Sequence, residues 1–181
     1  EAIESGIVFV TEERRRNGLL LDKSVAENIN FYLKNFSDKL NRLSIGNKIK
    51  FYDKNKEKNQ AETVVTKYDV VCESIRQPIC ELSGGNQQKV IIGRWLLDNP
   101  EILMMDEPTR GIDVGSKYEI YQKINTLASE GHSVIFISSE MPELIGVSDR
   151  ILVMSNGRVA GIVDAKMTGQ EEIMRLCAKY V

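Results

Sequence analysis

The sequence predicts an α/β fold built on a parallel β-sheet. Runs of β-branched and apolar residues at 7–11, 102–105 and 134–137 each have the length of a buried strand. Amphipathic helical patterns at 86–97 and 117–129 alternate with the later strands, which is typical of strands joined by crossover helices. With 181 residues, 42% of them hydrophobic and 28% charged, the chain has the composition of a globular domain with a substantial core.

The first part of the chain predicts one strand and two helices. Residues 7–11 (IVFVT) form the strand, and the charged cluster at 12–16 ends it. Ser24 followed by Glu27 is a capping-box pattern, which predicts the start of a helix. A second helix is expected where apolar residues recur on one face. These are Ala61, Val64, Val65 and Tyr68.

Between these helices lies a basic stretch, residues 34–58. It contains eight Lys or Arg against three Asp or Glu, together with several asparagines. A nucleic-acid surface and a solvated face or insertion are both consistent with such a charge run. We favour the solvated face, because the aromatic residues do not interleave with the basic ones as a stacking platform requires.

The last part of the chain predicts a short helix from Pro142, a β-hairpin and a final helix. The hairpin strands are expected at 151–154 and 159–163, joined by Asn156-Gly157, a type I′ turn signal. Thr168 and Glu171 are expected to cap the final helix, which carries Ile173, Leu176 and Cys177 inward.

Composition excludes several classes of protein. A net charge of −2 gives no overall case for nucleic-acid binding, and no apolar run approaches the roughly 18 residues of a membrane span. The three cysteines lack metal-ligand spacing and the single histidine has no second ligand nearby, so we expect reduced thiols in a cytosolic protein. Because the chain begins at Glu1 with neither an initiator Met nor a signal-peptide pattern, we expect it to be part of a longer protein.

One helix start is unusual. In CELSGGNQQKVIIGRW (80–95), Ser83 and two glycines precede an apolar helical pattern. Unpaired N–H groups and the helix dipole make such a start an anion site, and Gly84 and Gly85 permit close approach of a ligand. Taken alone, the pattern more often indicates a Ser N-cap after a loop.

Carboxylates follow the strand at 102–105 directly. Asp106 and Glu107 stand at the carboxyl end of a parallel strand, where ligands of open α/β sheets bind. Asp106 is placed to hold a Mg²⁺ water shell and Glu107 to orient or deprotonate an attacking water. Asp113 follows in a Gly-Ile-Asp turn, and the joint occurrence of these features is more specific than any one of them.

These motifs resemble those of ATP-binding cassette (ABC) ATPases. LSGGNQQ (82–88), ILMMDEP (102–108) and RGID (110–113) are similar to the signature, Walker B and D-loop motifs, and the similarity extends from Gly6 onward. TEERRRNGL (11–19), SGGNQQK, DEPTRGIDVG and SSEMPEL (138–144) together resemble the C-terminal cassette of two-cassette monosaccharide importers. GRWLL, SSEMPELIGVSDRILVMSNG and GIVD are most similar to the galactose and methyl-galactoside branch.

The resemblance implies a P-loop NTPase-like cassette with a parallel core sheet and a helical subdomain. No G-x-x-x-x-G-K-[ST] occurs in the chain, so the P-loop part is expected upstream of Glu1. Three regions are then expected: 1–18 ends the first core part with a Q-loop-like turn, 19–81 is the helical subdomain, and 82–181 carries the signature, Walker B, D-loop, switch region and C-terminal hairpin and helix.

The resemblance also implies which residues meet ATP. In the family, the signature helix of one cassette caps the γ-phosphate held by the P-loop of another. The residues matched to nucleotide binding are Ser83, Gly84, Gly85, Asn86, Gln87 and Asp113.

The remaining site residues belong to the cassette's own nucleotide site. Asp106 and Glu12 match the Mg²⁺ positions, and Glu107 and Ser139 the catalytic ones. Glu12 stands where the family usually has glutamine and Ser139 where it has the switch histidine. These substitutions predict that this cassette's own site is weak or non-hydrolytic, while its signature completes the competent site of the N-terminal cassette.

The expected function is that of an energy-coupling subunit. With ATP and Mg²⁺ as cofactors, it would hydrolyse ATP to drive monosaccharide uptake, at the cytoplasmic face of the membrane as a peripheral protein. Expected partners are the N-terminal cassette of the same polypeptide, membrane permease subunits and, indirectly, a periplasmic or lipid-anchored sugar-binding protein, with no nucleic acid. The alternatives are an ABC ATPase acting on nucleic acid or the ribosome, and a regulatory, non-hydrolytic cassette. The chain alone is expected to be inactive and to self-associate.

Overall fold

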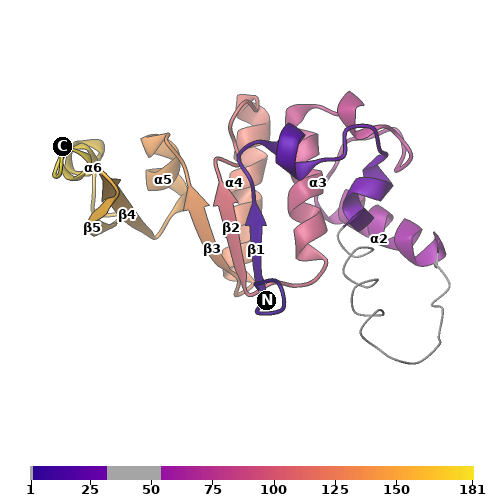
Figure 1. The fold of residues 1–181 in the computed structure, drawn as a ribbon, viewed down its shortest axis with the longest axis horizontal. Coiled ribbons are helices and arrows are strands. Elements are labelled where there is room, and N and C mark those ends of the chain that lie inside the picture. Colours follow the sequence, from indigo (N-terminus) through magenta and orange to yellow (C-terminus); the bar gives the residue numbers. More distant parts are fainter. Residues whose placement is uncertain (1, 32–53) are drawn as a thin grey trace.

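A three-stranded parallel sheet forms the centre of the protein. The computed structural model describes residues 2–31 and 54–181 (Figure 1). Within them, β1 (Ile7–Val10), β2 (Ile102–Asp106) and β3 (Ser133–Ile137) lie in the order β1-β2-β3. Ile7 pairs with Ile102, and Ile102 with Ser133, all in parallel. The predicted α/β class with a parallel sheet is therefore confirmed.

Helices and one hairpin make up the other elements. They are η1 (Arg14–Gly18), α2 (Lys54–Lys67), η2 (Ile79–Glu81), α3 (Gly84–Leu96), α4 (Val114–Ser129), α5 (Met141–Val147), β4 (Arg150–Ser155), β5 (Arg158–Asp164) and α6 (Gln170–Cys177). Residues 25–31 are also helical. Most of the basic stretch at 34–58 lies outside the described residues, and its last five residues open α2.

Side-chain caps explain where some of the helices begin. The predicted capping box is present, since the Ser24 amide donates to Glu27 Oε2 at 2.9 Å and the Glu27 amide to Ser24 Oγ at 3.2 Å. The predicted box at α6 is wrong. Gly169 precedes that helix without a side-chain cap, and the Thr168 hydroxyl donates to Glu172 at 2.9 Å.

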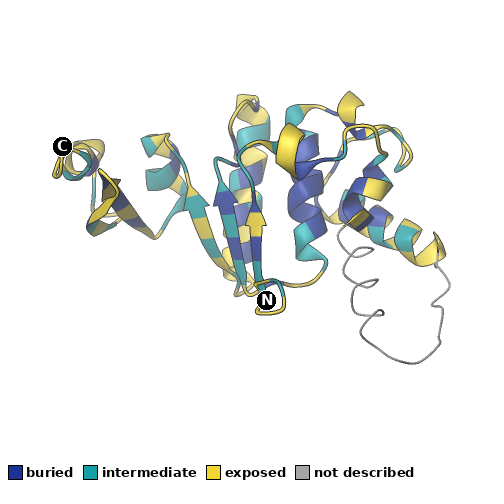
Figure 2. Ribbon diagram, in the orientation of Figure 1, coloured by how far each residue is buried: buried dark blue, intermediate teal, exposed yellow. Residues whose placement is uncertain are grey.

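Helices cover one face of the parallel sheet. Val8, Val10, Leu103 and Met105 are buried in one cluster with apolar residues of α3 and α4. A second, smaller cluster joins the β4–β5 hairpin to α6 (Figure 2). The hairpin turn has φ values of +46° at Asn156 and +74° at Gly157, as the type I′ signal predicts.

The opposite face of the sheet is open. Phe9 is 43% exposed, and Ile135 and Ile137 are 47% and 45% exposed. Alternation along a strand places these side chains on the face away from α3 and α4. Apolar surface of this kind on neighbouring strands favours association.

We therefore expect the chain to self-associate in solution. Multi-angle light scattering over a wide concentration range should show a mass that rises with concentration. Replacing Ile135 and Ile137 by Lys should shift the distribution toward monomer, because two charges would then have to be desolvated in the contact. The matched control is Val71→Lys, at an exposed position away from the sheet. A monodisperse monomer for the unmodified chain would contradict the prediction.

Candidate functional site

The carboxyl ends of the three parallel strands bring the predicted residues to one edge of the sheet. The Glu107 amide donates to the carbonyl of Ile137 at 2.9 Å, which continues the β2–β3 pairing by one residue. The Ser139 amide then donates to Glu107 Oε1 at 2.6 Å. Glu107 and Ser139, 32 positions apart in the sequence, are therefore in direct contact, through the main chain of Ser139.

Asp106 is available to a ligand at this edge. Among the described residues, no hydrogen bond or ion pair engages its carboxylate, and its side chain is only partly buried. The part of the chain that the structure describes contains no group of three or more His, Cys, Asp or Glu side chains placed to hold a metal ion by themselves. A single free carboxylate fits Mg²⁺ bound mainly by water and phosphate oxygens.

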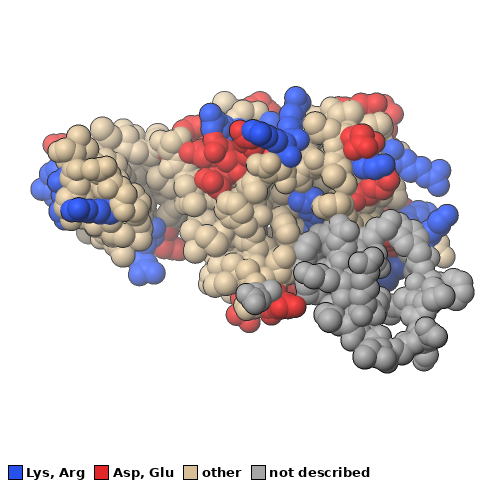
Figure 3. All heavy atoms as spheres, in the orientation of Figure 1, with Lys and Arg blue, Asp and Glu red and all other residues tan. Residues whose placement is uncertain are grey.

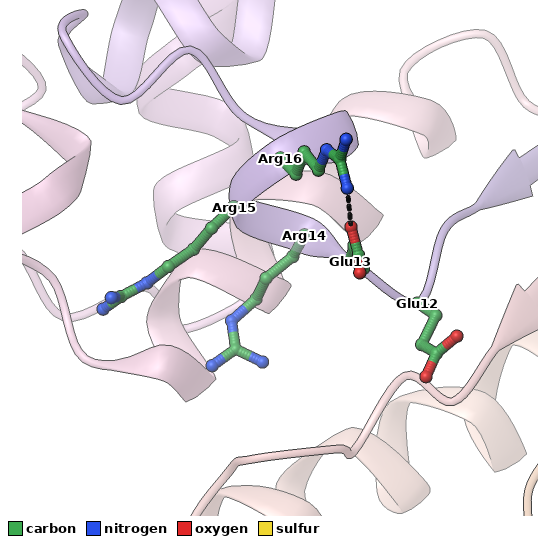
Figure 4. Close-up of a pocket in the computed structure, with 5 residues that line it drawn as sticks. All are labelled: Glu12, Glu13, Arg14, Arg15 and Arg16. Carbon is green, nitrogen blue, oxygen red and sulfur yellow. Dashed lines mark ion pairs between the residues drawn. The ribbon is translucent and has the colours of Figure 1, made fainter.

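Glu12 follows β1 at the same edge but has another partner. Its carboxylate forms an ion pair with Arg110, in the turn that follows Glu107. Glu12 also lines a surface hollow with the next four residues of the chain (Figure 4). To serve a metal ion, Glu12 would have to leave Arg110.

The signature segment forms the start of α3. Ser83 is the N-cap, and its hydroxyl oxygen accepts from the amide of Asn86. The Asn86 side chain donates to Ser83 Oγ at 3.0 Å and accepts from the Val71 amide at 2.8 Å. Gln87 is fully buried and donates to the carbonyls of Ile79 and Leu82, so it supports the turn before the helix from inside the core.

The two glycines of the signature pack against the chain itself. A Cβ at Gly84 would lie 2.7 Å from Arg14 Nη2. A Cβ at Gly85 would lie 2.4 Å from Ser116 Oγ and 2.5 Å from Ser116 Cβ. From the sequence, we explained the two glycines by the close approach of a ligand. The structure adds a second requirement, close packing against η1 and α4.

Asp113 forms the cap of α4. Its Oδ1 accepts from the Ser116 amide at 3.0 Å, and this hydrogen bond lowers the pKa of the Asp113 carboxyl. The cap explains why α4 begins at Val114, three residues before the predicted start. It also places Ser116 against Gly85, so the D-loop and the signature adjoin.

A buried carboxylate that sequence reasoning missed lies behind the site. Glu143, in α5, is 7% exposed and accepts four different donors. They are Thr109 Oγ1 at 2.9 Å, Ser138 Oγ at 2.9 Å, Lys117 Nζ at 2.8 Å and Tyr121 Oη at 2.5 Å. The only local signal in the sequence was the spacing of Lys117 and Tyr121, which are four positions apart on a predicted helix and can therefore share one hydrogen-bond acceptor.

The hydrogen bonds keep Glu143 ionised. Burial raises the pKa of its carboxyl, but the bonds from Lys117, Tyr121, Ser138 and Thr109 together lower it below the ordinary value. Bonds to Glu140 and to Glu143 raise the pKa of Lys117. Burial and the bond to Glu143 raise the pKa of Tyr121 to about 12. Glu143 therefore carries a fixed negative charge beside the fixed positive charge of Lys117.

A parallel sheet whose strand ends carry these carboxylates, with a serine-glycine helix start beside it, defines an ATP-binding cassette. A sequence profile described as ABC transporter matches residues 2–110. The chain belongs to this family, whose members bind ATP.

Curated relatives match the whole chain. It is 52% identical over 181 residues to a protein of Mannheimia succiniciproducens named "Galactose/methyl galactoside import ATP-binding protein MglA". Proteins of the same name from Pasteurella multocida and Escherichia coli strain K12 are 53% and 52% identical. The chain spans 34% of the length of each of them.

Solved structures agree on the fold. One is a nucleotide-free ATP-binding cassette from an ABC transporter, with a TM-score of 0.71, 23% identity and coverage of 97% of this chain and 66% of that one. Another is the ATP-binding cassette MJ0796 bound to ADP and phosphate, with a TM-score of 0.69, 21% identity and coverage of 90% and 64%. At this identity they show the fold alone.

Glu143→Gln should reduce stability in a pH-dependent way. A carboxyl with a lowered folded pKa stabilises the protein above the unfolded value of about 4.3, and this contribution is lost as the pH falls through the folded value. We expect Gln to lower the free energy of unfolding by about 1–3 kcal/mol at pH 7, with the difference from wild type shrinking below about pH 4. Urea unfolding at both pH values measures it. The control is Glu140→Gln, which also loses a bond to Lys117 but is half exposed. Equal effects of the two variants at pH 7 would contradict the prediction.

Gly85→Ala should destabilise the protein through Ser116. Because the added Cβ has no room beside Ser116, we expect a loss of about 1–3 kcal/mol in the free energy of unfolding. Adding Ser116→Gly should recover part of that loss in a double-mutant cycle. Gly115→Ala is the control, since its Cβ would meet only Asp113 Oδ1 at 3.4 Å. An additive cycle would show that the two positions do not collide.

Proposed function

We propose that this chain is the C-terminal cassette of the ATP-binding subunit of a monosaccharide importer, with a galactoside as the imported sugar. The observation that carries this proposal is the identity of 52% along the whole chain to proteins named for galactose and methyl galactoside import. Residues 1–18 would end the first core part, 19–81 would form the helical subdomain, and 82–181 the signature-to-switch region.

The exposed start of α3 would act on a nucleotide held by the N-terminal cassette of the same polypeptide. Ser83 caps the helix, which leaves backbone N–H groups and the positive end of the helix dipole at the surface. These groups favour the γ-phosphate of ATP. Closure of the two cassettes around ATP would then complete a hydrolytic site.

The strand ends would form this cassette's own nucleotide site. Asp106 would hold Mg²⁺ through water, and Glu107 would orient the attacking water. Ser139 donates its main-chain amide to Glu107, and its side chain is shorter than the histidine usual in the family. Together with the Glu12–Arg110 pair, this supports a site with little or no turnover.

The partners would be membrane permease subunits and, through them, a sugar-binding protein. The subunit would lie on the cytoplasmic face of the membrane as a peripheral protein. Across the described residues, no helix has the length and apolar character needed to cross a bilayer.

The nucleic-acid alternative finds no support on the face of the molecule that Figure 3 shows. Figure 3 shows basic and acidic side chains interspersed on the face drawn, with no continuous basic field. Binding to a phosphate backbone requires such a field.

The chain alone should not hydrolyse ATP. It lacks the backbone cradle and lysine of the P-loop, which fix the β- and γ-phosphates. Phosphate release by the purified chain should equal that of a Glu107→Gln preparation. Turnover that survives further purification and disappears in Glu107→Gln would contradict the prediction.

Signature and Walker B substitutions should have unequal effects in the full-length transporter. Gly84→Asp adds a carboxylate at the helix start that would meet the γ-phosphate and a Cβ that has no room beside Arg14. A loss of about 1.4 kcal/mol already slows a step tenfold. We expect sugar uptake and ATPase activity in reconstituted vesicles nearly to stop. Glu107→Gln removes a base from a site with little turnover, so activity should fall by less than about threefold, or roughly 0.65 kcal/mol.

Wild-type vesicles with and without the sugar-binding protein provide the control. If wild type shows no galactoside uptake while its ATPase activity is intact, the proposed substrate is wrong. If Glu107→Gln stops turnover as completely as Gly84→Asp, this cassette's own site is catalytic and the asymmetry is wrong.

A further inference from the structure

Arg14 connects η1 to a turn that lies almost a hundred positions further along the chain. From η1, its Nη1 donates to the carbonyl of Arg110 at 2.7 Å and its Nη2 to the carbonyl of Gly111 at 3.2 Å. The planar guanidinium thus binds two successive carbonyls of the D-loop turn with its two terminal nitrogens. In Figure 4 the Arg14 side chain points away from that of Arg16, on the same turn of helix.

The same guanidinium lies against the signature. The space beside the Gly84 Cα is filled by Arg14, whose Nη2 would be 2.7 Å from a Cβ there, and by the Gly111 carbonyl oxygen at 3.4 Å. Three segments therefore meet at one side chain: η1, the start of α3, and the turn at 110–111. Of these three, the start of α3 is the segment that the proposed function assigns to the contact with the opposing cassette.

The charges around Arg14 leave it bound to main-chain oxygens. Glu12 pairs with Arg110, and Glu13 lies 3.6 Å from Arg16. Across residues 2–31 and 54–181, no carboxylate forms an ion pair with Arg14. Burial, with a smaller effect of Arg15, lowers the pKa of Arg14. A partly desolvated guanidinium held by two carbonyls has little freedom to move, which suits a positioning role.

We propose that Arg14 is a positioning residue that fixes the D-loop turn at 110–111 against the start of α3, so that both segments meet the opposing cassette as one surface. The inference rests on the proposed function, and it assigns Arg14 no contact with nucleotide. Without Arg14 the turn at 110–111 loses two hydrogen bonds to η1, and Gly84 loses the guanidinium against which it packs.

The test uses the full-length transporter in vesicles and the variants Arg14→Ala, Arg14→Lys and Arg14→Gln. Since ATP is bound by the P-loop of the other cassette, we expect KM for ATP to stay within about twofold, while kcat falls about tenfold, equivalent to roughly 1.4 kcal/mol. Lys keeps the charge but cannot reach two carbonyls with one ammonium group, so it should lose about as much as Ala. Arg16→Ala is the matched control, because it removes the same charge from the same turn at an exposed side chain.

Amide hydrogen exchange on the same transporter separates positioning from loss of folding. In the Arg14 variants we expect faster exchange at 110–113, with unchanged exchange in β2 and an unchanged melting temperature. Full activity of Arg14→Lys, or equal activity of Arg14→Ala and Arg16→Ala, would overturn the proposal, and so would unchanged exchange at 110–113. If Arg14→Ala does not fold, the same measurements on Arg14→Lys and Arg14→Gln test the proposal. Absence of sugar-stimulated turnover in the wild type would count against the proposed function only, because the exchange comparison still tests Arg14.

Discussion

The burial of α3 is the constraint on which the rest of the structure depends. Val90, Ile91 and Ile92 are each at most 2% exposed, and the helix packs against η1, β1, α2 and α4. A helix held on so many sides cannot shift along its axis without opening the core. Its exposed start, the signature, is therefore placed by the packing of its buried remainder.

The loops around the site are fixed by long-range polar contacts. Arg14 binds carbonyls in the D-loop turn, and Glu143 ties Thr109, two residues after Glu107, to Ser138, one residue before Ser139. Each contact joins a segment that ends one strand to a segment that ends another. The parallel sheet brings these ends to one edge, and the polar contacts then set their conformations.

Local sequence patterns were sufficient to predict the strands and helix starts, but they were not sufficient to predict these long-range contacts. The β-branched runs gave the strands, and Ser83 and Ser24 gave helix starts, because each signal acts within a few residues. Asp106 and Glu107 were expected at the carboxyl end of their strand and lie there, since strand direction decides that. Ser139 was matched to its position by resemblance alone. Nothing near Arg14 in the sequence indicates that it meets Gly111, because side-chain contacts over such separations depend on the completed fold. The same holds for Glu143, whose helix also reads as an ordinary amphipathic turn.

The charge arrangement at the strand ends gives the proposed asymmetry a physical basis. Glu12 is an anion at a place where Mg²⁺ and phosphates would gather, and in this structure Arg110 neutralises it. If Glu12 turned to a metal ion, Arg110 would lose its partner on the D-loop turn; a neutral glutamine would carry no such cost. The signature has no corresponding conflict, since Ser83 and the glycines offer backbone donors whose geometry is already fixed by Arg14 and Ser116. These contacts support the proposal that the cassette completes a neighbour's site rather than operating its own.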